Sequence, residues 1–523
     1  MVPPRVLHAA IRPQPQPWVI AWGCRVDFQL AEIYTAAELG VTSVADGGAL
    51  VISDGSARLI YADETTNTAR SIAIGTVAAP GSGYVQTQSA SQDLGGVQPG
   101  AGMAFHSTGS TTRAYIFGSH SGTLSTAVIG ASGVPGASNK VATSNGTLTG
   151  VETFTVFDGP ARDFAALSQW NQPGVTLYEI AGDSSLTQVA FQGDSDKAYV
   201  KTVSDSTMVT MAGGDYLLTL SALENGLTSY QVEANGRMVL NDSLGNQDGL
   251  AVTGAAALTA LEVGGVQYVV IAATTSSSLS VVRVNDLGCL YVVDQVVDDR
   301  TTRFEGTETL AAFTVNGRSF VVTGGTDAGL SFYELLPGGA LAHFHDEVLE
   351  TGSGIQAITS IAAAVDGNSV QLFIVDAGSD QIFEYNLIMS DLGTQITVSG
   401  GVASGTALAD RLLGAGGNEV LSGNDGADFL HDGAGADTLT GGRGADTFVL
   451  CNDNGTDRIS DFENGLDRID LSDWGMVYDV STLTITATAQ GARVSFGAQV
   501  LEITTNNGSS LGGGSLTNAD FIF

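Results

Sequence analysis

A nine-residue period at residues 405–449 constrains the fold of this 523-residue chain more than any other feature. Its five copies read GTALADRLL, GAGGNEVLS, GNDGADFLH, DGAGADTLT and GGRGADTFV. The sixth position is always acidic, and its residues are Asp410, Glu419, Asp428, Asp437 and Asp446. The eighth position is always large and apolar, and its residues are Leu412, Leu421, Leu430, Leu439 and Phe448. This pattern, G-G-x-G-x-D-x-U-x with U apolar, predicts a parallel β-roll.

Each nonapeptide is expected to form a turn followed by a short strand, which together make half a coil. Glycines permit positive φ in the turn and expose backbone carbonyls, while the apolar residue of the strand points inward. Two nonapeptides complete one coil, so residues eighteen positions apart stack at the strand spacing of about 4.8 Å. Asp410, Asp428 and Asp446 should then line one edge of the roll, and Glu419 and Asp437 the other.

The stacked carboxylates predict a metal site, because they repel one another unless a cation lies between them. Ca²⁺ suits such a site, since it accepts six to eight carboxylate and carbonyl oxygens, whereas Mg²⁺ demands stricter octahedral geometry. The candidate ligands are Asp410, Glu419, Gly423, Gly426, Asp428, Gly433, Gly435, Asp437, Gly441, Gly442, Gly444 and Asp446. We expect two or three calcium ions, with Asp428 and Asp446 as the best pair. One apolar residue per half-coil makes a very small core, so calcium binding should drive folding.

The copies are not equivalent. The first has Thr406 and Leu408 where glycines belong, so we expect its turn to bind no ion. The second carries a glutamate, a longer but usable ligand, and the fourth begins with Asp432 instead of glycine.

A second period, near 52 residues, fills the first 400 residues. Its apolar landmarks are Val175, Leu227, Leu279, Leu330 and Ile382, and weaker copies near Leu124 and Leu59 would make seven. Each unit holds a short apolar strand, a tight turn such as Asn316-Gly317, a strongly apolar strand, the landmark strand and a polar stretch. Asn-Gly between apolar runs is a strong hairpin signal, because the turn requires positive φ.

Four strands per unit, repeated about seven times, predict an all-β chain with a seven-bladed β-propeller ahead of the β-roll. The alternating stretch Val26–Leu30 is a candidate strand that completes the last blade and closes the ring. A β-sandwich array or a β-helix is the alternative, which the regular four-strand units disfavour. The expected divisions are a Pro-rich segment at 1–24, the propeller at 25–400, the roll at 401–450 and a C-terminal β region at 451–523.

Composition excludes several classes of protein. The formal net charge of −35 argues against a nucleic-acid partner, which requires a basic face. No apolar stretch reaches the roughly 18 residues of a membrane span, so none is expected. Prolines at 13, 15 and 17 make the N-terminus a poor secretory signal. Cys24, Cys289 and Cys451 match neither a zinc spacing nor a disulfide framework, and we interpret them as incidental thiols.

Residues 405–523 resemble the C-terminal domain of serralysin-type RTX exoproteins, which carry the hemolysin-type calcium-binding repeat. After the repeats come Gly444-Ala-Asp-Thr-Phe-Val-Leu450 and Asp457-Arg-Ile-Ser-Asp-Phe-Glu-Asn-Gly-Leu-Asp-Arg-Ile-Asp-Leu-Ser472, similar to the segment that follows the roll in that family. Ala519-Asp-Phe-Ile-Phe523 resembles an uncleaved type I secretion signal. The resemblance implies export through a type I secretion apparatus by a Gram-negative bacterium, and a secreted, extracellular or cell-surface protein.

The serralysin protease motif H-E-x-x-H is missing from the sequence. The nearest segment is His343-Phe-His-Asp-Glu347, which we interpret as a solvated blade loop rather than a zinc site. A P-loop lysine is missing as well, and we expect no catalytic residue and no cofactor besides Ca²⁺.

The propeller is expected to bind an extracellular protein or glycan. One alternative is a hydrolase of lactonase, phosphatase or glycosidase type, for which Asp54, Asp158, Asp327 and Asp376 are candidate residues. Acidic residues at hairpin turns are usually turn formers, however. The other alternative is a structural subunit of an extracellular assembly.

Overall fold

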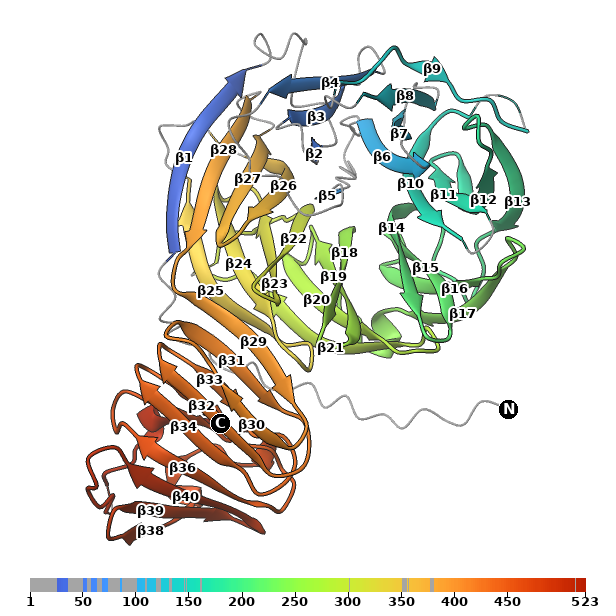
Figure 1. The fold of residues 1–523 in the computed structure, drawn as a ribbon. Helices are drawn as coiled ribbons and strands as arrows, with labels where there is room; N and C mark the ends of the chain where they lie inside the picture. Colours follow the sequence, from blue (N-terminus) through green and yellow to red (C-terminus); the bar gives the residue numbers. More distant parts are fainter. Residues whose placement is uncertain are drawn as a thin grey trace.

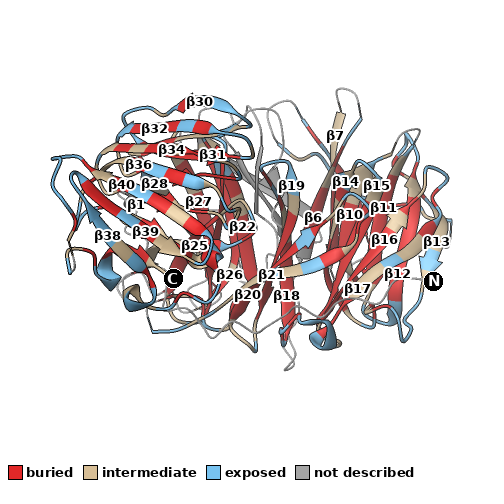
Figure 2. Cartoon of the chain, turned by 90° about the horizontal axis from the view of Figure 1, so that it is seen from below, coloured by how far each residue is buried: buried red, intermediate tan, exposed pale blue. Residues whose placement is uncertain are grey.

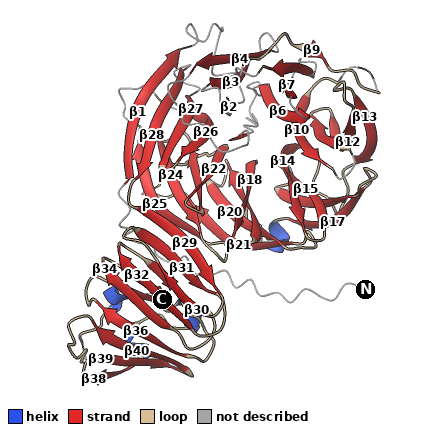
Figure 3. Cartoon of the chain, viewed as in Figure 1, coloured by secondary structure: helices blue, strands red, loops and turns tan. Residues whose placement is uncertain are grey.

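The computed structural model describes residues 26–35, 50–53, 58–63, 68–73 and 85–86, and residues 101–523 with short gaps. The gaps are 109–110, 119–123, 131–133, 145, 147, 160–161, 301, 350–354, 356, 377–380 and 513. Strands dominate the described chain, as Figure 3 shows. Its helices are four 3₁₀ turns: η1 (Asn246–Asp248), η2 (Ser472–Trp474), η3 (Val480–Thr482) and η4 (Asn518–Asp520). The all-β prediction is therefore confirmed.

Five antiparallel sheets in a ring are four-stranded and pair in chain order (Figure 1). The first two comprise β6 (Ala101–Thr108), β7 (Thr111–Gly118), β8 (Ser125–Ile129) and β9 (Asn139–Lys140), then β10 (Val151–Asp158), β11 (Asp163–Gln169), β12 (Gln172–Ile180) and β13 (Leu186–Gln192). The next two comprise β14 (Val203–Met211), β15 (Gly214–Ser221), β16 (Gly226–Val232) and β17 (Met238–Leu244), then β18 (Ala255–Val263), β19 (Val266–Ala273), β20 (Ser278–Val284) and β21 (Leu290–Val297). The fifth comprises β22 (Thr309–Val315), β23 (Arg318–Gly324), β24 (Gly329–Leu335) and β25 (Leu341–Val348).

The N-terminal strand completes a sixth blade, as predicted. Three consecutive strands, β26 (Ile358–Asp366), β27 (Ser369–Asp376) and β28 (Gln381–Met389), form its inner part. β1 (Val26–Thr35) pairs antiparallel with β28 along the outer edge. This pairing joins the two ends of the propeller segment and covers a sheet edge that would otherwise be exposed.

Among the residues that the structure describes, the propeller has six regular blades, so the prediction of seven is wrong. The remaining four-stranded sheet departs from their order and runs β4-β3-β2-β5. It consists of β2 (Leu50–Ser53), β3 (Arg58–Asp63), β4 (Thr68–Ala73) and β5 (Val85–Gln86). The chain after β4 is rich in glycine, serine and glutamine and lacks an apolar run that would add a fourth consecutive strand. Instead, the two residues of β5 pair with β2.

The landmark residues of the 52-residue period all lie on the third strand of a blade. Val175, Leu227, Leu279, Leu330 and Ile382 are fully buried. Figure 2 shows the blade strands as mostly buried, because each sheet is covered by its neighbours. The Asn316-Gly317 turn joins β22 to β23 with φ of 52° and 77°, as the hairpin signal requires.

The C-terminal part is a roll of two mainly parallel sheets. One contains β29 (Leu392–Val398), β31 (Ala409–Gly414), β33 (Phe429–His431), β35 (Thr447–Val449), β37 (Arg468–Asp470) and β41 (Phe521–Ile522). The other contains β30 (Gly401–Ser404), β32 (Glu419–Asp425), β34 (Thr438–Arg443), β36 (Thr456–Phe462), β40 (Gln499–Thr505), β39 (Gly491–Phe496) and β38 (Thr484–Thr488). The last three strands are joined by antiparallel pairing.

The roll is longer than the 401–450 predicted for it. It begins with β29, which pairs in parallel with β31, and it continues through β36 and β37. A half-coil of the roll needs only one inward-facing apolar residue on a short strand. Outside the nonapeptides, where the full glycine turn is absent, this residue is Ile396, Ile459 or Ile469. The core is also larger than one residue per half-coil, because Trp474, Leu501 and other C-terminal residues join it.

A buried group of three charged side chains connects the roll to a blade. Glu334 on β24 accepts hydrogen bonds from Arg318 Nε at 2.8 Å and Nη2 at 2.7 Å, and from Arg411 Nη2 on β31 at 2.7 Å. Arg318 Nη1 also donates to the Ala409 carbonyl of the roll at 2.8 Å. Burial alone would raise the pKa of Glu334, but the two guanidinium charges hold that pKa below its usual value.

Candidate metal centre

The acidic residues of the nonapeptides form two ladders, as the eighteen-residue spacing predicted. In the first, the Asp410 N–H donates to Asp428 Oδ1 at 2.7 Å, and the Asp428 N–H donates to Asp446 Oδ1 at 2.9 Å. In the second, the Glu419 N–H donates to Asp437 Oδ1 at 2.6 Å. Each acceptor carboxylate therefore caps the backbone of the preceding coil with one oxygen, which leaves its other oxygen for a different partner.

Four carboxylate oxygens of the two ladders are buried and accept no hydrogen bond from any described residue. They are Glu419 Oε2, Asp428 Oδ2, Asp437 Oδ2 and Asp446 Oδ2. A buried carboxylate oxygen without a partner is costly, so four in two stacked rows fit a site for a cation. The chemistry fits Ca²⁺, a hard cation that binds carboxylate and carbonyl oxygens.

Asp410 differs from the other ladder residues, as the departures in the first copy suggested. Its Oδ2 accepts hydrogen bonds from the backbone N–H of Thr406 and from the Thr406 hydroxyl, the latter at 2.9 Å. The threonine that replaces a glycine thus occupies the oxygen that is unpartnered in the later copies.

The predicted glycines lie where a side chain would block this site. A Cβ at Gly423 or Gly441 would overlap Oδ2 of Asp428 or Asp446, respectively. A Cβ at any of the other predicted glycines would overlap a backbone carbonyl of the preceding coil, and these are Gly426, Gly433, Gly435, Gly442 and Gly444. The glycines therefore bring carboxylate and carbonyl oxygens of successive coils together.

Gly444 provides a direct test of this close approach. It has φ of 137°, and a Cβ there would overlap the Gly426 carbonyl oxygen. We therefore expect Gly444→Ala to raise the calcium concentration needed to fold the roll. Gly416→Ala is the control and should leave that concentration unchanged. A Cβ at Gly416 would meet only the Ala434 carbonyl oxygen, at 4.0 Å. Circular dichroism during calcium titration measures both. Equal midpoints for the two variants would contradict the close packing of turns.

Burial raises the pKa of the ladder carboxyls. For Asp428, Asp437 and Asp446 the pKa rises to about 7, mainly through desolvation and further through neighbouring acidic groups. The calcium-free roll is therefore a poor host for ionised carboxylates near neutral pH.

These shifts predict opposite pH effects with and without calcium. Without it, the folded roll holds protons that the unfolded chain releases near pH 3.9, so stability is highest in acid. That stability should fall by up to about 1.4 kcal/mol per pH unit per carboxyl as pH rises from about 4 to about 7, and it should level off above. With calcium, protons compete with the ion, so affinity should increase over the same range. Circular dichroism at pH 5 and pH 8 checks both trends, and the same trend in both conditions would refute the linkage.

Two further rungs of the ladders were missed by the sequence analysis. The Asp437 N–H donates to Asp457 Oδ1 and the Asp446 N–H donates to Asp467 Oδ1, each at 3.0 Å. Burial raises the pKa of Asp457 to about 6 and that of Asp467 to about 7. The signal was the triplet Asp-Arg-Ile, which repeats the acidic and apolar positions of the nonapeptide. Insertions lengthen the spacing to 20 and 21 residues and hide it from a strict period.

Asp432, where the fourth copy departs from glycine, lies beside the second ladder. Its carboxylate oxygen lies within 4.8 Å of oxygens of Asp437 and Asp457, and all three side chains are buried. This cluster extends the second ladder, and its three carboxylates could hold one cation.

The other candidate residues lie on the propeller. Asp158 ends β10 and forms a cluster with His106 and Asp163, in which His106 Nε2 is 2.9 Å from Asp163 Oδ2. Desolvation raises the pKa of Asp327 to about 6. Asp376 accepts a hydrogen bond from the Ala357 N–H at 2.7 Å, and Asp54 lies outside the described residues.

The segment His343–Glu347 is part of the outer strand β25, so its interpretation as a loop is wrong. A register shift between Phe332 and Tyr333 breaks the strand alternation opposite the two histidines. His343 lies 2.8 Å from Asp346, and His345 lies 3.2 Å from Glu347.

Residues 413–448 match the family of RTX calcium-binding nonapeptide repeats, in four copies. The chain therefore carries RTX calcium-binding repeats in its β-roll, behind a propeller. No curated protein matches the chain in sequence.

Solved structures similar to the chain include a functionally unknown protein from Desulfotomaculum acetoxidans, with 11% identity and a TM-score of 0.36 over 64% of this chain and 96% of that one. A Lactobacillus plantarum protein has 14% identity and a TM-score of 0.38 over 64% and 94%. A Bacteroides uniformis protein, described as a candidate 6-phosphogluconolactonase, has 14% identity and a TM-score of 0.37 over 65% and 95%. Among the described residues, no helix is long and apolar enough to cross a membrane.

Proposed function

We propose that this chain is a secreted calcium-binding RTX protein whose propeller binds an extracellular protein or glycan. The roll binds two or three calcium ions and folds on them after type I export. The four buried, unpartnered carboxylate oxygens of the ladders carry the metal part of the proposal. Asp428 and Asp446 of one ladder and Glu419 and Asp437 of the other would hold the ions, with carbonyl oxygens of the glycine turns. Bound calcium supplies the charge that allows these carboxylates to be ionised inside the fold.

Export before folding suits the position of the segment that resembles a type I signal. Asp520 ends η4, and Phe521 on β41 is buried and pairs beside β37. A signal packed in this way is accessible only while the roll is unfolded. A calcium-poor cell interior would keep the chain in that state, and external calcium would then fold it.

Secretion from a Gram-negative host with a type I apparatus tests this proposal. Deletion of Asp520–Phe523 should trap the chain inside the cell. Asp446→Asn is the matched control, because it weakens calcium-dependent folding but leaves the final segment intact, so it should still reach the medium. Undiminished secretion of the deletion variant, or retention of both variants, would refute the role of the segment.

A propeller hydrolase is the second candidate function, and the cluster of His106, Asp158 and Asp163 favours it. These residues come from two neighbouring blades, whereas a catalytic site at a channel mouth would draw carboxylates from three or more. Assays with lactones, phosphate esters and glycosides test it. Turnover that His106→Ala abolishes would favour the hydrolase over the binding module.

A further inference from the structure

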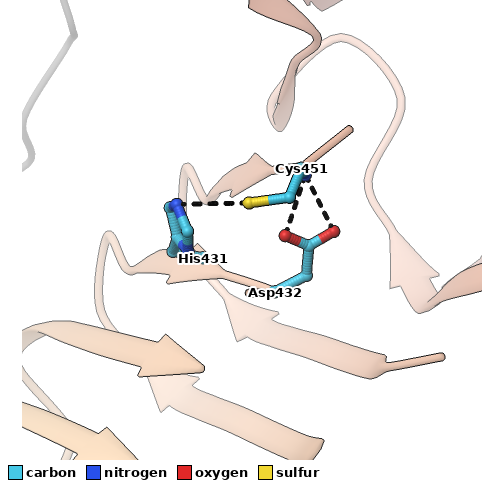
Figure 4. Close-up of side chains that lie close together, drawn as sticks. All are labelled: His431, Asp432 and Cys451. Carbon is cyan, nitrogen blue, oxygen red and sulfur yellow. Dashed lines mark hydrogen bonds between the residues drawn. The ribbon is translucent and has the colours of Figure 1, made fainter. Parts of the chain in front are cut away.

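We propose that His431, Asp432 and Cys451 form a second metal site in the roll, chemically different from the calcium ladders, which binds one zinc ion. Figure 4 shows the three side chains close to one another. His431 is the last residue of β33. One possible ligand atom from each, a ring nitrogen, a carboxylate oxygen and a sulfur, lies within 4.8 Å of the other two. The Cys451 Sγ lies 3.6 Å from His431 Nε2.

The stacking of the coils places these residues together. His431 pairs with Val449 in the parallel register of β33 and β35. The chain continues to Cys451, whose N–H donates to both carboxylate oxygens of Asp432, at 2.9 and 3.1 Å. The site therefore comes from two successive coils, and Cys451 follows His431 by 20 positions and Asp432 by 19. This explains why the cysteines matched no local zinc spacing.

The donor set selects a borderline-soft cation. Zinc in proteins is bound by cysteine sulfur, histidine nitrogen and carboxylate oxygen, usually in four-coordinate geometry. Calcium and magnesium prefer oxygen ligands throughout, so imidazole and thiolate disfavour both. The three protein donors leave a fourth position for water.

The formal charges of the three donors agree with this assignment. Held by a neutral imidazole, a carboxylate and a thiolate, Zn²⁺ would form a group whose charges sum to zero.

The site is distinct from the calcium ladders although Asp432 faces both. Asp432 also lies in the cluster with Asp437 and Asp457, whereas His431 and Cys451 belong only to the proposed zinc site. Substitutions at these two residues therefore test the zinc site without removing a ladder carboxylate.

The experiment uses the untagged full chain, saturated with millimolar calcium and stripped of zinc, with Co²⁺ as a spectroscopic probe. We expect one Co²⁺ per chain, a thiolate-to-cobalt charge-transfer band and displacement of cobalt by Zn²⁺. Cys451→Ser should abolish the band, and both Cys451→Ser and His431→Gln should weaken binding at least about tenfold, as the loss of even an indirect metal contact does. Cys289→Ser, at a thiol in the propeller, is the matched control and should change nothing.

Circular dichroism in calcium shows whether each variant is folded. If Cys451→Ser does not fold, the loss of cobalt binding by His431→Gln is the test of the site. No stoichiometric cobalt binding in calcium-saturated protein would overturn the site. Binding that survives both substitutions, or that depends on Cys451 but not on His431, would overturn it equally.

Discussion

Asp446→Asn is expected to raise the calcium concentration at the folding midpoint of the roll at least about tenfold, because calcium affinity depends on the number of charged ligands. The substitution keeps the shape of the side chain and one oxygen that can accept the Asp428 N–H. It removes the charge at a buried position where Oδ2 accepts no hydrogen bond from described residues. Calcium titration of the full chain, followed by circular dichroism and limited proteolysis, measures the midpoint.

The same substitution should have the opposite effect without calcium. Above pH 7 the Asp446 carboxyl is buried and ionised in the folded apo roll, which costs stability. Asparagine removes that cost, so Asp446→Asn should stabilise the apo roll slightly while weakening its response to calcium. A merely structural role of Asp446 would lower stability in both conditions.

Glu502→Gln provides the control for net charge. Glu502 is exposed on β40 of the same roll, and its substitution changes the charge by the same amount. Its calcium midpoint should match that of the unaltered chain. An equal shift for Asp446→Asn and Glu502→Gln would mean that calcium responds to the overall charge and not to a site in the ladder.

The sequence predicted the repeating parts of this molecule well, because each repeat has a physical reason that acts locally. An apolar residue equivalent to Leu227 occurs in each repeat because every blade needs a buried third strand. An acidic residue equivalent to Asp428 occurs in each nonapeptide because every coil stacks its carboxylate on that of the preceding coil. Both periods depend on contacts between neighbouring copies, so spacing alone carries the information.

Features that join unlike parts of the chain could not be predicted in the same way. The N-terminal strand β1 was predicted to complete the last blade, and it does. The irregular sheet of β2–β5 could not be predicted, because its sequence does not follow the 52-residue period. Asp457 and Asp467 escaped because insertions shift the spacing. The contact of Cys451 with His431 and the contact of Arg411 with Glu334 exist only after the coils stack and the roll meets its blade.

Glu334→Gln is expected to lower the free energy of unfolding of the calcium-loaded chain by about 3–5 kcal/mol, the usual cost of leaving a buried charge without its partner. Glutamine keeps the shape of the side chain but leaves the guanidinium groups of Arg318 and Arg411 facing each other, both buried. Urea denaturation in millimolar calcium measures the loss. The triple variant Arg318→Met, Glu334→Leu and Arg411→Met should recover most of it, since apolar side chains of similar size replace buried ion pairs at little cost.

Glu179→Gln is the matched control, because Glu179 pairs with Arg162 at 2.7 Å on the exposed part of a blade. Exposed pairs contribute about 1 kcal/mol or less, so this substitution should have a small effect. An equally large loss for both variants would show that burial does not determine the contribution of Glu334.

Calcium removal should reduce the loss caused by Glu334→Gln. Arg411 lies on β31 of the roll, so unfolding of the roll returns its guanidinium to water and opens the site around Arg318 to solvent. The penalty then falls toward that of an exposed pair. The difference between the two penalties measures the coupling between Glu334 and the folded, calcium-loaded roll. A penalty that is unchanged in chelator would place the whole effect of Glu334 within the propeller.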